Sequence, residues 1–224
     1  MISKINKSKL FLGMSDEDIL KCIKCSSGKV RSLKRNEIIF NENQTPKYLY
    51  VLIEGSIAVC KDTYSGKVTI LNTFNKSGDV FGEVYVFKNN QNYEQYTIAV
   101  GDSSVLEIPK VFFYSTCGNS CGYHSILIRN MLSMLAEKAY FLNKKIQILS
   151  SGSLRGKISK YLIENKGDNN KVCMKMNREE FANFLSVARP SLSRELLKMK
   201  DEELIELKGK EIIIKDIKKL EKFL

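Results

Sequence analysis

The residues whose side chains are best suited to bind a ligand lie between Arg189 and Lys200. An arginine guanidinium can donate two hydrogen bonds to O6 and N7 of guanine, whereas serine and lysine serve bases or phosphates less selectively. Leu192, Leu196 and Met199 have the spacing of one helix face, which places the polar side chains on the opposite face. The sequence therefore predicts a helix whose exposed face can enter a DNA groove. Its candidate DNA contacts are Arg189, Pro190, Ser191, Ser193, Arg194 and Lys198.

A second predicted helix precedes this one and positions it. Asn177 followed by Glu180 resembles an N-cap with a capping box, so a helix is expected over Arg178–Leu185. A turn over residues 186–188 leads into the next helix, where Pro190 occupies a first-turn position that tolerates its missing N–H. Two short helices joined in this way predict a helix-turn-helix.

The chain after these helices reads as a β-hairpin. Leu204–Leu207 and Glu211–Ile214 are strand-like, and Lys208 and Lys210 flank the glycine between them as candidate phosphate contacts. The helix pair and the hairpin together predict a winged helix. By spacing alone, a packed helical hairpin with a solvated basic side is an equal alternative for the helix pair.

A long helix is expected from about Ser125 to Leu149. Its apolar residues alternate steps of four and three over three heptads, which is the a/d seam of a coiled coil and predicts a homodimer. A second stripe at Leu127, Met134, Phe141 and Ile148 suggests another face packed on the preceding domain. The alternative is one broadly buried helix in a monomer. The predicted dimer-interface residues are Ile128, Leu132, Leu135, Ala139, Leu142, Ile146 and Leu149.

Short apolar runs separated by turn residues fill the chain from Val30 to Ile108, including Val80–Phe87, and predict a β-sandwich or barrel. Ser15 is expected to cap a short helix over Asp16–Cys25 before it. The small residues 150–153 mark a boundary. We therefore expect an α+β protein with a β sensor domain over residues 1–124, a dimerisation helix and hinge over 125–150, and a winged helix-turn-helix domain over 151–224.

Composition agrees with a nucleic-acid partner without identifying its site. The 36 basic and 25 acidic residues give a net charge of +11, which favours a polyanionic partner. The excess is spread along the chain, because residues 151–224 hold 17 basic and 12 acidic side chains and residues 1–150 hold 19 and 13. No apolar run is long enough to span a membrane, and no secretory signal is present, so a cytoplasmic protein without membrane contact is expected.

Four features together resemble the CRP/FNR superfamily of bacterial transcription regulators: Gly55-Ser56-Ile57, Gly78–Glu83, the long helix, and Asn177–Ala182 through Arg189–Arg194. The resemblance implies a jelly-roll sensor domain, a homodimer, a winged helix on a palindromic operator of double-stranded DNA, and RNA polymerase as a partner. It places Arg189, Ser191 and Arg194 at base-reading positions. Pro190 departs from the acidic residue of the cyclic-AMP receptor, so the operators need not match.

The same resemblance locates an effector pocket around Gly82, Glu83, Tyr93 and Glu94. A buried cyclic phosphate needs a cationic partner, yet Tyr93-Glu94 stands where the family has an Arg-Ser pair. The Glu94 carboxylate would repel the phosphate. We therefore expect an unidentified small-molecule effector other than cyclic AMP.

No cofactor or metal is predicted, although relatives use haem or iron–sulfur clusters. Cys22 and Cys25 have metal-pair spacing but lie on one expected helix, and Cys117, Cys121 and His124 could join them only through the fold. Free thiols are expected, and whether these residues bind a metal or sense redox state is left open. His124 is more simply a capping or surface histidine.

Enzyme classes find little support in the sequence. One histidine excludes a multi-histidine metal centre, and no phosphate-binding GxxxxGK[ST] loop occurs. The rival class is a cyclic-nucleotide-binding regulatory module that acts through protein partners, which would leave the basic helix at Arg189–Arg194 unexplained. The operator sequence, and whether transcription rises or falls, stay open.

Overall fold

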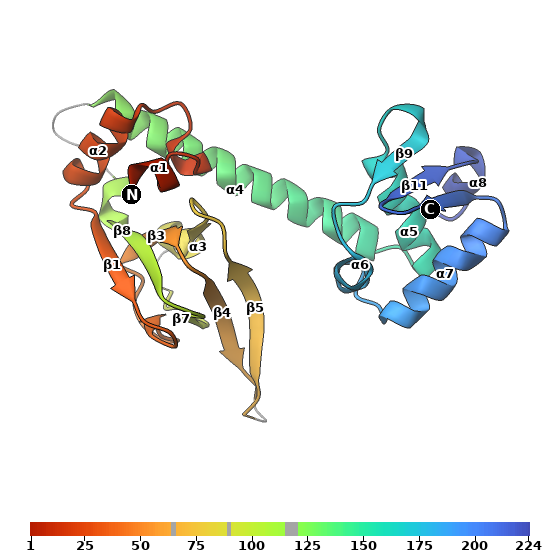
Figure 1. The fold of residues 1–224 in the computed structure, drawn as a ribbon, viewed down its shortest axis with the longest axis horizontal. Coiled ribbons are helices and arrows are strands. Elements are labelled where there is room, and N and C mark those ends of the chain that lie inside the picture. Colours follow the sequence, from red (N-terminus) through yellow and green to blue (C-terminus); the bar gives the residue numbers. More distant parts are fainter. Residues whose placement is uncertain (64–65, 89–90, 115–120) are drawn as a thin grey trace. The chain divides into compact units, whose positions relative to one another are not determined.

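The computed structural model describes residues 1–63, 66–88, 91–114 and 121–224. The chain divides into two compact units, Met1–Glu137 and Lys138–Leu224. Figure 1 shows strands concentrated in the N-terminal unit and helices with a small sheet in the C-terminal unit. The α+β expectation is confirmed.

Two four-stranded antiparallel sheets form the N-terminal unit, in the orders β1-β8-β3-β6 and β2-β7-β4-β5. Strand order departs from chain order, as in a jelly roll. The strands are β1 (Lys29–Leu33), β2 (Ile38–Phe40), β3 (Tyr48–Glu54), β4 (Ile57–Asp62), β5 (Val68–Phe74), β6 (Val80–Phe81), β7 (Tyr96–Ala99) and β8 (Ser103–Pro109).

Alternation along β3 separates two cores in this unit. Leu49, Val51 and Ile53 pack under the helices, whereas Tyr50 and Leu52 face the second core, inside the jelly roll. The remaining elements of the unit are α1 (Ile2–Ile5), η1 (Lys9–Phe11), α2 (Asp16–Cys25), α3 (Glu83–Phe87), η2 (Lys110–Phe113) and the first part of α4 (Gly122–Leu149).

The sequence prediction for Val80–Phe87 is only partly right. The strand β6 ends at Phe81, and α3 takes over from Glu83. Gly82 between them has φ +79°, a left-handed conformation that ends the strand and that glycine adopts without steric cost. The predicted helix Asp16–Cys25 is confirmed, and Ser15 closes a capping box with Asp18.

The C-terminal unit surrounds its own core. It contains α5 (Leu154–Asn165), η3 (Asp168–Asn170), β9 (Lys171–Cys173), α6 (Arg178–Phe184), α7 (Arg189–Asp201), β10 (Ile205–Lys208), β11 (Glu211–Ile214) and α8 (Ile217–Glu221). The antiparallel order β10-β11-β9 shows that the predicted hairpin has a third strand beside it.

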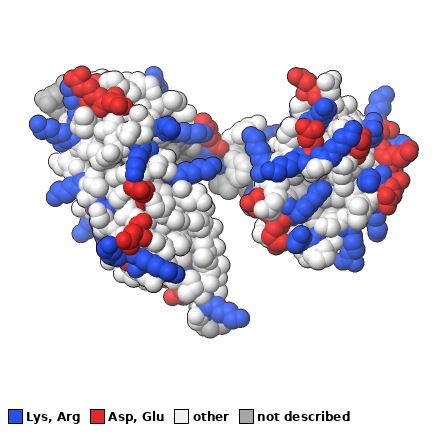
Figure 2. Space-filling view, in the orientation of Figure 1, with Lys and Arg blue, Asp and Glu red and all other residues white. Residues whose placement is uncertain are grey.

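Basic and acidic side chains intermix on the visible face of both units (Figure 2). On this face, charge by itself therefore does not mark an interface, in line with the even spread of charge along the sequence. Among the described residues, no helix is long and apolar enough to cross a membrane.

Candidate nucleic-acid interface

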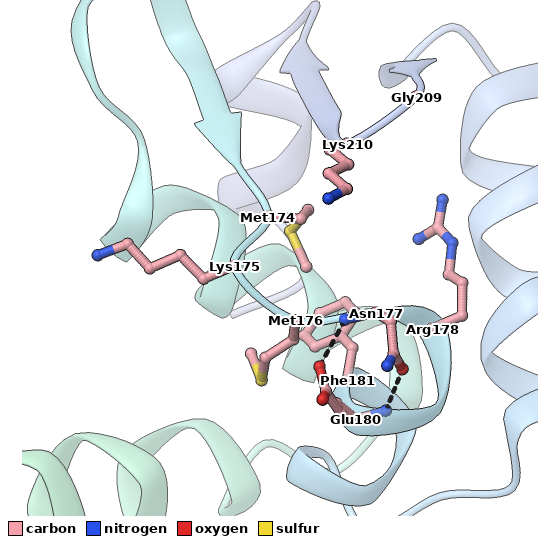
Figure 3. A pocket seen from close by; sticks show the side chains of 9 residues that line it. All are labelled: Met174, Lys175, Met176, Asn177, Arg178, Glu180, Phe181, Gly209 and Lys210. Atoms are coloured by element: carbon pink, nitrogen blue, oxygen red, sulfur yellow. Dashed lines mark hydrogen bonds between the residues drawn. The ribbon is translucent and has the colours of Figure 1, made fainter. Parts of the chain in front are cut away.

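The helix pair α6–α7 is held by local sequence and by a shared core. Asn177 N donates to Glu180 Oε2 at 2.8 Å, and Glu180 N donates to Asn177 Oδ1 at 2.9 Å, which confirms the predicted capping box (Figure 3). Pro190 lies in the first turn of α7. The buried side chains that anchor the two helices are Phe181, Leu185, Leu192, Leu196 and Met199.

The opposite face of α7 is open to solvent. Arg189, Pro190, Arg194 and Lys198 are exposed, and Ser191 and Ser193 are half-buried. Arg189 Nε lies 3.8 Å from Glu179 Oε2, and Arg194 Nε donates to the Pro190 carbonyl oxygen at 3.4 Å. Both contacts are long and exposed, so each guanidinium can turn to another acceptor at little cost.

Arg155 on α5 ties α7 to the rest of the unit. Its Nε donates to Glu195 Oε1 at 2.6 Å, and its Nη1 and Nη2 donate to the two carboxylate oxygens of Glu202 at 2.6 and 2.8 Å. Hydrogen bonds from Arg155 lower the pKa of Glu202 and keep that carboxyl ionised. This clamp fixes the orientation of α7 through planar, charge-assisted bonds.

A groove of about 430 Å³ separates the wing from the start of α6. In Figure 3 the side chains of Arg178 and Lys210 extend into the space between these elements, whereas Lys175 points away from it. The turn depends on Gly209, whose φ is +58°. Two cations from segments far apart in sequence thus border one concave surface.

The sequence analysis did not single out Arg178, which lines this groove. Burial lowers the pKa of its guanidinium, and a partly desolvated cation gains free energy when an anion pairs with it. The signal was its place directly after the N-cap Asn177, beside the predicted wing. Lys208 differs, because its Nζ lies 3.0 Å from Glu206 Oε1.

The expected effector residues lie around the side chains of Tyr50 and Tyr85 but differ in exposure. Gly82 packs against the Tyr50 ring, and Tyr93 is buried with its ring stacked on Phe40 at 3.8 Å between centroids. Glu83 is also buried. Glu94 is exposed, with its Oε1 3.3 Å from Lys88 Nζ.

The predicted dimer seam is largely uncovered within one chain. Leu132, Leu142 and Ile146 are 59%, 56% and 63% exposed. Ala139 is exposed as well, and Ile128, Leu135 and Leu149 are half-buried. The second stripe packs as expected at Leu127 and Met134, which join the N-terminal core. Ile148 joins the C-terminal core, and Phe141 is exposed.

No group of three or more metal-ligating side chains occurs in the described residues. Cys22, Cys25, Cys60 and Cys173 are free thiols, and burial raises the pKa of Cys22 to about 12. Cys121 is disulfide-bonded, so the free-thiol expectation is wrong there. Cys117 lies outside the described residues. His124 is buried, not on the surface, with Nε2 2.6 Å from the Phe112 carbonyl oxygen.

Two family models match the chain, and together they cover most of it. Residues 30–120 match a cyclic nucleotide-binding domain, and residues 156–223 match a Crp-like helix-turn-helix domain. The chain is 24% identical over 182 residues to the cAMP-activated global transcriptional regulator CRP of Pasteurella multocida, covering 79% of this chain and 85% of that relative. It is 22% identical over 188 residues to the nitrogen fixation regulation protein FixK of Azorhizobium caulinodans, covering 81% and 73%.

Solved structures share the fold. The catabolite activator protein of Thermus thermophilus matches with a TM-score of 0.54 at 18% identity, over 96% of this chain and 98% of that one. A CooA mutant from Carboxydothermus hydrogenoformans matches with a TM-score of 0.54 at 19% identity, over 93% and 96%.

Proposed function

The chain belongs to the CRP/FNR superfamily of transcription regulators and carries the DNA-binding helix-turn-helix of that family, and from this premise we propose that it acts as a homodimer on a palindromic operator. The observation that carries the proposal is α7, whose apolar face is buried while its Arg189–Lys198 face is open. A helix of this kind can lie in a major groove with its N-terminal residues against base edges.

The dimer proposal rests on the exposed seam of α4. Large aliphatic side chains at regular heptad positions gain free energy when a second surface covers them and removes them from water. Leu132, Leu142 and Ile146 meet that description. A two-fold axis along the seam would relate two copies of α7, which is why a palindromic operator is proposed.

The proposed base-reading residues are Arg189, Ser191 and Arg194, with Pro190, Ser193 and Lys198 beside them. Arg178 and Lys210 are the proposed phosphate contacts, because both border the groove between wing and α6. Lys208 is a weaker candidate, since it would first have to leave Glu206. RNA polymerase is the proposed protein partner of the bound dimer, by family membership.

The effector is proposed to differ from cyclic AMP. Tyr93 lies among Phe40, Tyr50 and Tyr85 in a packed aromatic cluster, and Glu94 places a carboxylate rather than a cation beside it. Neither residue supplies the positive charge that a cyclic phosphate needs.

Selection of bound sequences from random double-stranded DNA tests the proposal. The expected product is two inverted half-sites whose centres are about 10–10.5 base pairs apart, or a multiple, because a two-fold dimer presents its helices to major grooves on one side of the duplex. Enrichment of no motif, with binding independent of salt, would refute it, since phosphate contacts release counterions. Enrichment of a single half-site would refute the dimeric mode alone.

A further inference from the structure

The C-terminal unit holds a further cavity, of about 510 Å³, bordered by the last turns of α4, the end of α5 and α6. All of its lining residues belong to this unit. In Figure 3 the side chains of Lys175 and Met176, which line it, extend away from Lys210. None of the proposed DNA contacts lines this cavity, and its volume is typical of small-molecule pockets.

Aromatic and aliphatic side chains form most of the cavity wall. Phe184 on α6 joins the three helices, because its ring centroid lies 6.1 Å from that of Phe141 on α4 and 5.5 Å from that of Tyr161 on α5. These rings pack on one another, so this part of the wall is formed before any ligand binds. The apolar lining residues are Tyr140, Phe141, Ile148, Tyr161, Met176 and Phe184.

Three lysines and one glutamate carry the charge of the cavity. Lys144 Nζ lies 3.3 Å from Glu164 Oε2, so these two side chains neutralise each other. Lys145 Nζ lies 5.3 Å from the centroid of the Phe184 ring, and Lys175 is exposed. Among the described residues, no carboxylate lies within ion-pair distance of Lys145 or Lys175. The cavity therefore keeps two cationic groups that an anionic ligand can pair with.

One hydroxyl on the cavity wall also lacks a partner. Tyr161 is 8% exposed, and its hydroxyl makes no hydrogen bond to the residues that the structure describes. Burial raises the pKa of Tyr161, so the hydroxyl stays protonated at neutral pH and can donate. The adjacent Asn165 is already engaged, because its Nδ2 donates to the Tyr161 carbonyl oxygen at 2.8 Å. Buried hydroxyls are usually paired, so this one calls for an acceptor.

We propose that the cavity between α4, α5 and α6 binds an amphiphilic carboxylate, a small molecule with one anionic head and an apolar body. The body lies against Ile148, Met176 and Phe184, and its removal from water supplies much of the binding free energy. The carboxylate pairs with Lys145 and Lys175 and accepts from the Tyr161 hydroxyl. Both halves of the ligand are needed, because an ion pair with partly exposed lysines contributes little by itself. Aliphatic and aromatic carboxylates share this chemistry.

Isothermal titration calorimetry on the full chain tests the two halves of the ligand with matched probes. Octanoate and cinnamate carry a carboxylate on an aliphatic and an aromatic body, octanol and cinnamyl alcohol are uncharged counterparts, and acetate lacks the apolar body. At least one of the two larger carboxylates is expected to bind and to raise the melting temperature, because binding to the native state stabilises it. Its alcohol and acetate should bind about tenfold more weakly or not at all. The tighter of the two carboxylates identifies an aliphatic or an aromatic source.

Lys145→Gln and Lys175→Gln each remove one cation from the cavity and keep a polar side chain. Affinity for the carboxylate should fall about three- to tenfold in each variant, between the effects of an exposed and a buried ion pair. Affinity for the matching alcohol should stay unchanged. Lys166→Gln is the matched control, because Lys166 is exposed and does not line the cavity, and it should bind both probes as the unmodified chain does.

Tyr161→Phe removes only the unpartnered hydroxyl and keeps the ring against Phe184, so carboxylate affinity should fall about two- to tenfold. Circular dichroism confirms that each variant is folded. The proposal is overturned if neither octanoate nor cinnamate binds, if the alcohols or acetate bind as tightly, or if all three cavity variants bind the carboxylates with unchanged affinity. None of these measurements uses DNA, so their failure leaves the proposed DNA binding untouched, and a failed operator selection leaves this site untouched.

Discussion

Arg194 and Lys210 are both exposed cations of the C-terminal unit. Replacing them with alanine should nevertheless have different effects on DNA binding. Arg194→Ala is expected to cost about 1–3 kcal/mol on the best operator and to relax the preference at one position in each half-site, because it removes base contacts. Arg189→Ala should behave similarly. Lys210→Ala and Arg178→Ala should weaken all sequences alike and reduce the salt slope by about one unit.

Fluorescence anisotropy on operator and random duplexes at several salt concentrations measures both quantities. Lys218→Ala is the matched control, because it removes an exposed lysine from α8, outside the helix pair and the wing. Equal losses on specific and random DNA for Arg194→Ala would make that arginine a phosphate contact. No loss at all would contradict a groove-facing α7.

Glu94 leads to a second prediction at the residue scale, which concerns cyclic nucleotides. Cyclic AMP and cyclic GMP should leave the melting temperature unchanged, because the carboxylate and the packed Tyr93 offer no positive charge to the phosphate. Differential scanning fluorimetry at millimolar nucleotide measures this, with added sodium phosphate as the control for ionic strength. A rise of several degrees would show that Tyr93-Glu94 does not replace the phosphate-binding pair.

At the scale of the element, Arg155 on α5 holds α7 through Glu195 and Glu202. Arg155→Ala should lower the melting temperature by several degrees and reduce operator affinity, since Glu195 and Glu202 lose the guanidinium that fixes the helix. Lys160→Ala, which removes another cation from α5, is the control and should change both less. Calorimetry and the same anisotropy assay give the two readouts.

The Arg155 clamp also sets a pH dependence. The folded-state pKa of Glu202 lies below its ordinary value because Arg155 donates to the ionised carboxylate. Its contribution to the free energy of unfolding is therefore complete above the unfolded pKa of about 4.3 and is lost as the pH falls through the lower folded pKa. Arg155→Ala should flatten this acid limb, and an unchanged limb would show that the bond to Glu202 adds nothing.

At the scale of the whole molecule, the exposed seam of α4 is expected to determine whether the chain is a monomer or a dimer. The double variant Leu132→Glu/Leu142→Glu should be monomeric, because each substitution would bury an unpaired charge in a coiled-coil interface. Leu135 is the poorer choice, since it packs against the N-terminal core and its loss would also affect folding. Sedimentation velocity at micromolar concentration measures the state of each form.

Val111→Glu is the control for the seam variant, because Val111 is similarly exposed but lies on η2. It should sediment as the unmodified chain does. An unmodified chain that is monomeric at these concentrations would contradict the homodimer, and so would a dimer that survives both seam substitutions.

The sequence by itself determined the elements whose signals are local. The cap at Ser15, the capping box at Asn177 and the apolar spacing of α7 located these helices to within a residue or two, because capping bonds and helix periodicity involve neighbours three or four positions apart. Heptad spacing likewise predicts the seam, and the structure shows that Leu132, Leu142 and Ile146 are exposed. For the same reason family membership was readable from short motifs.

Only the tertiary structure decided which distant residues meet. Arg155 reaches Glu202 across 47 positions, Arg178 and Lys210 border one groove through the wing, and Lys145 and Lys175 line one cavity beside α6. No periodic pattern specifies such pairs, because they follow from how whole faces pack. The burial of His124 has the same origin, because the surrounding core covers its ring.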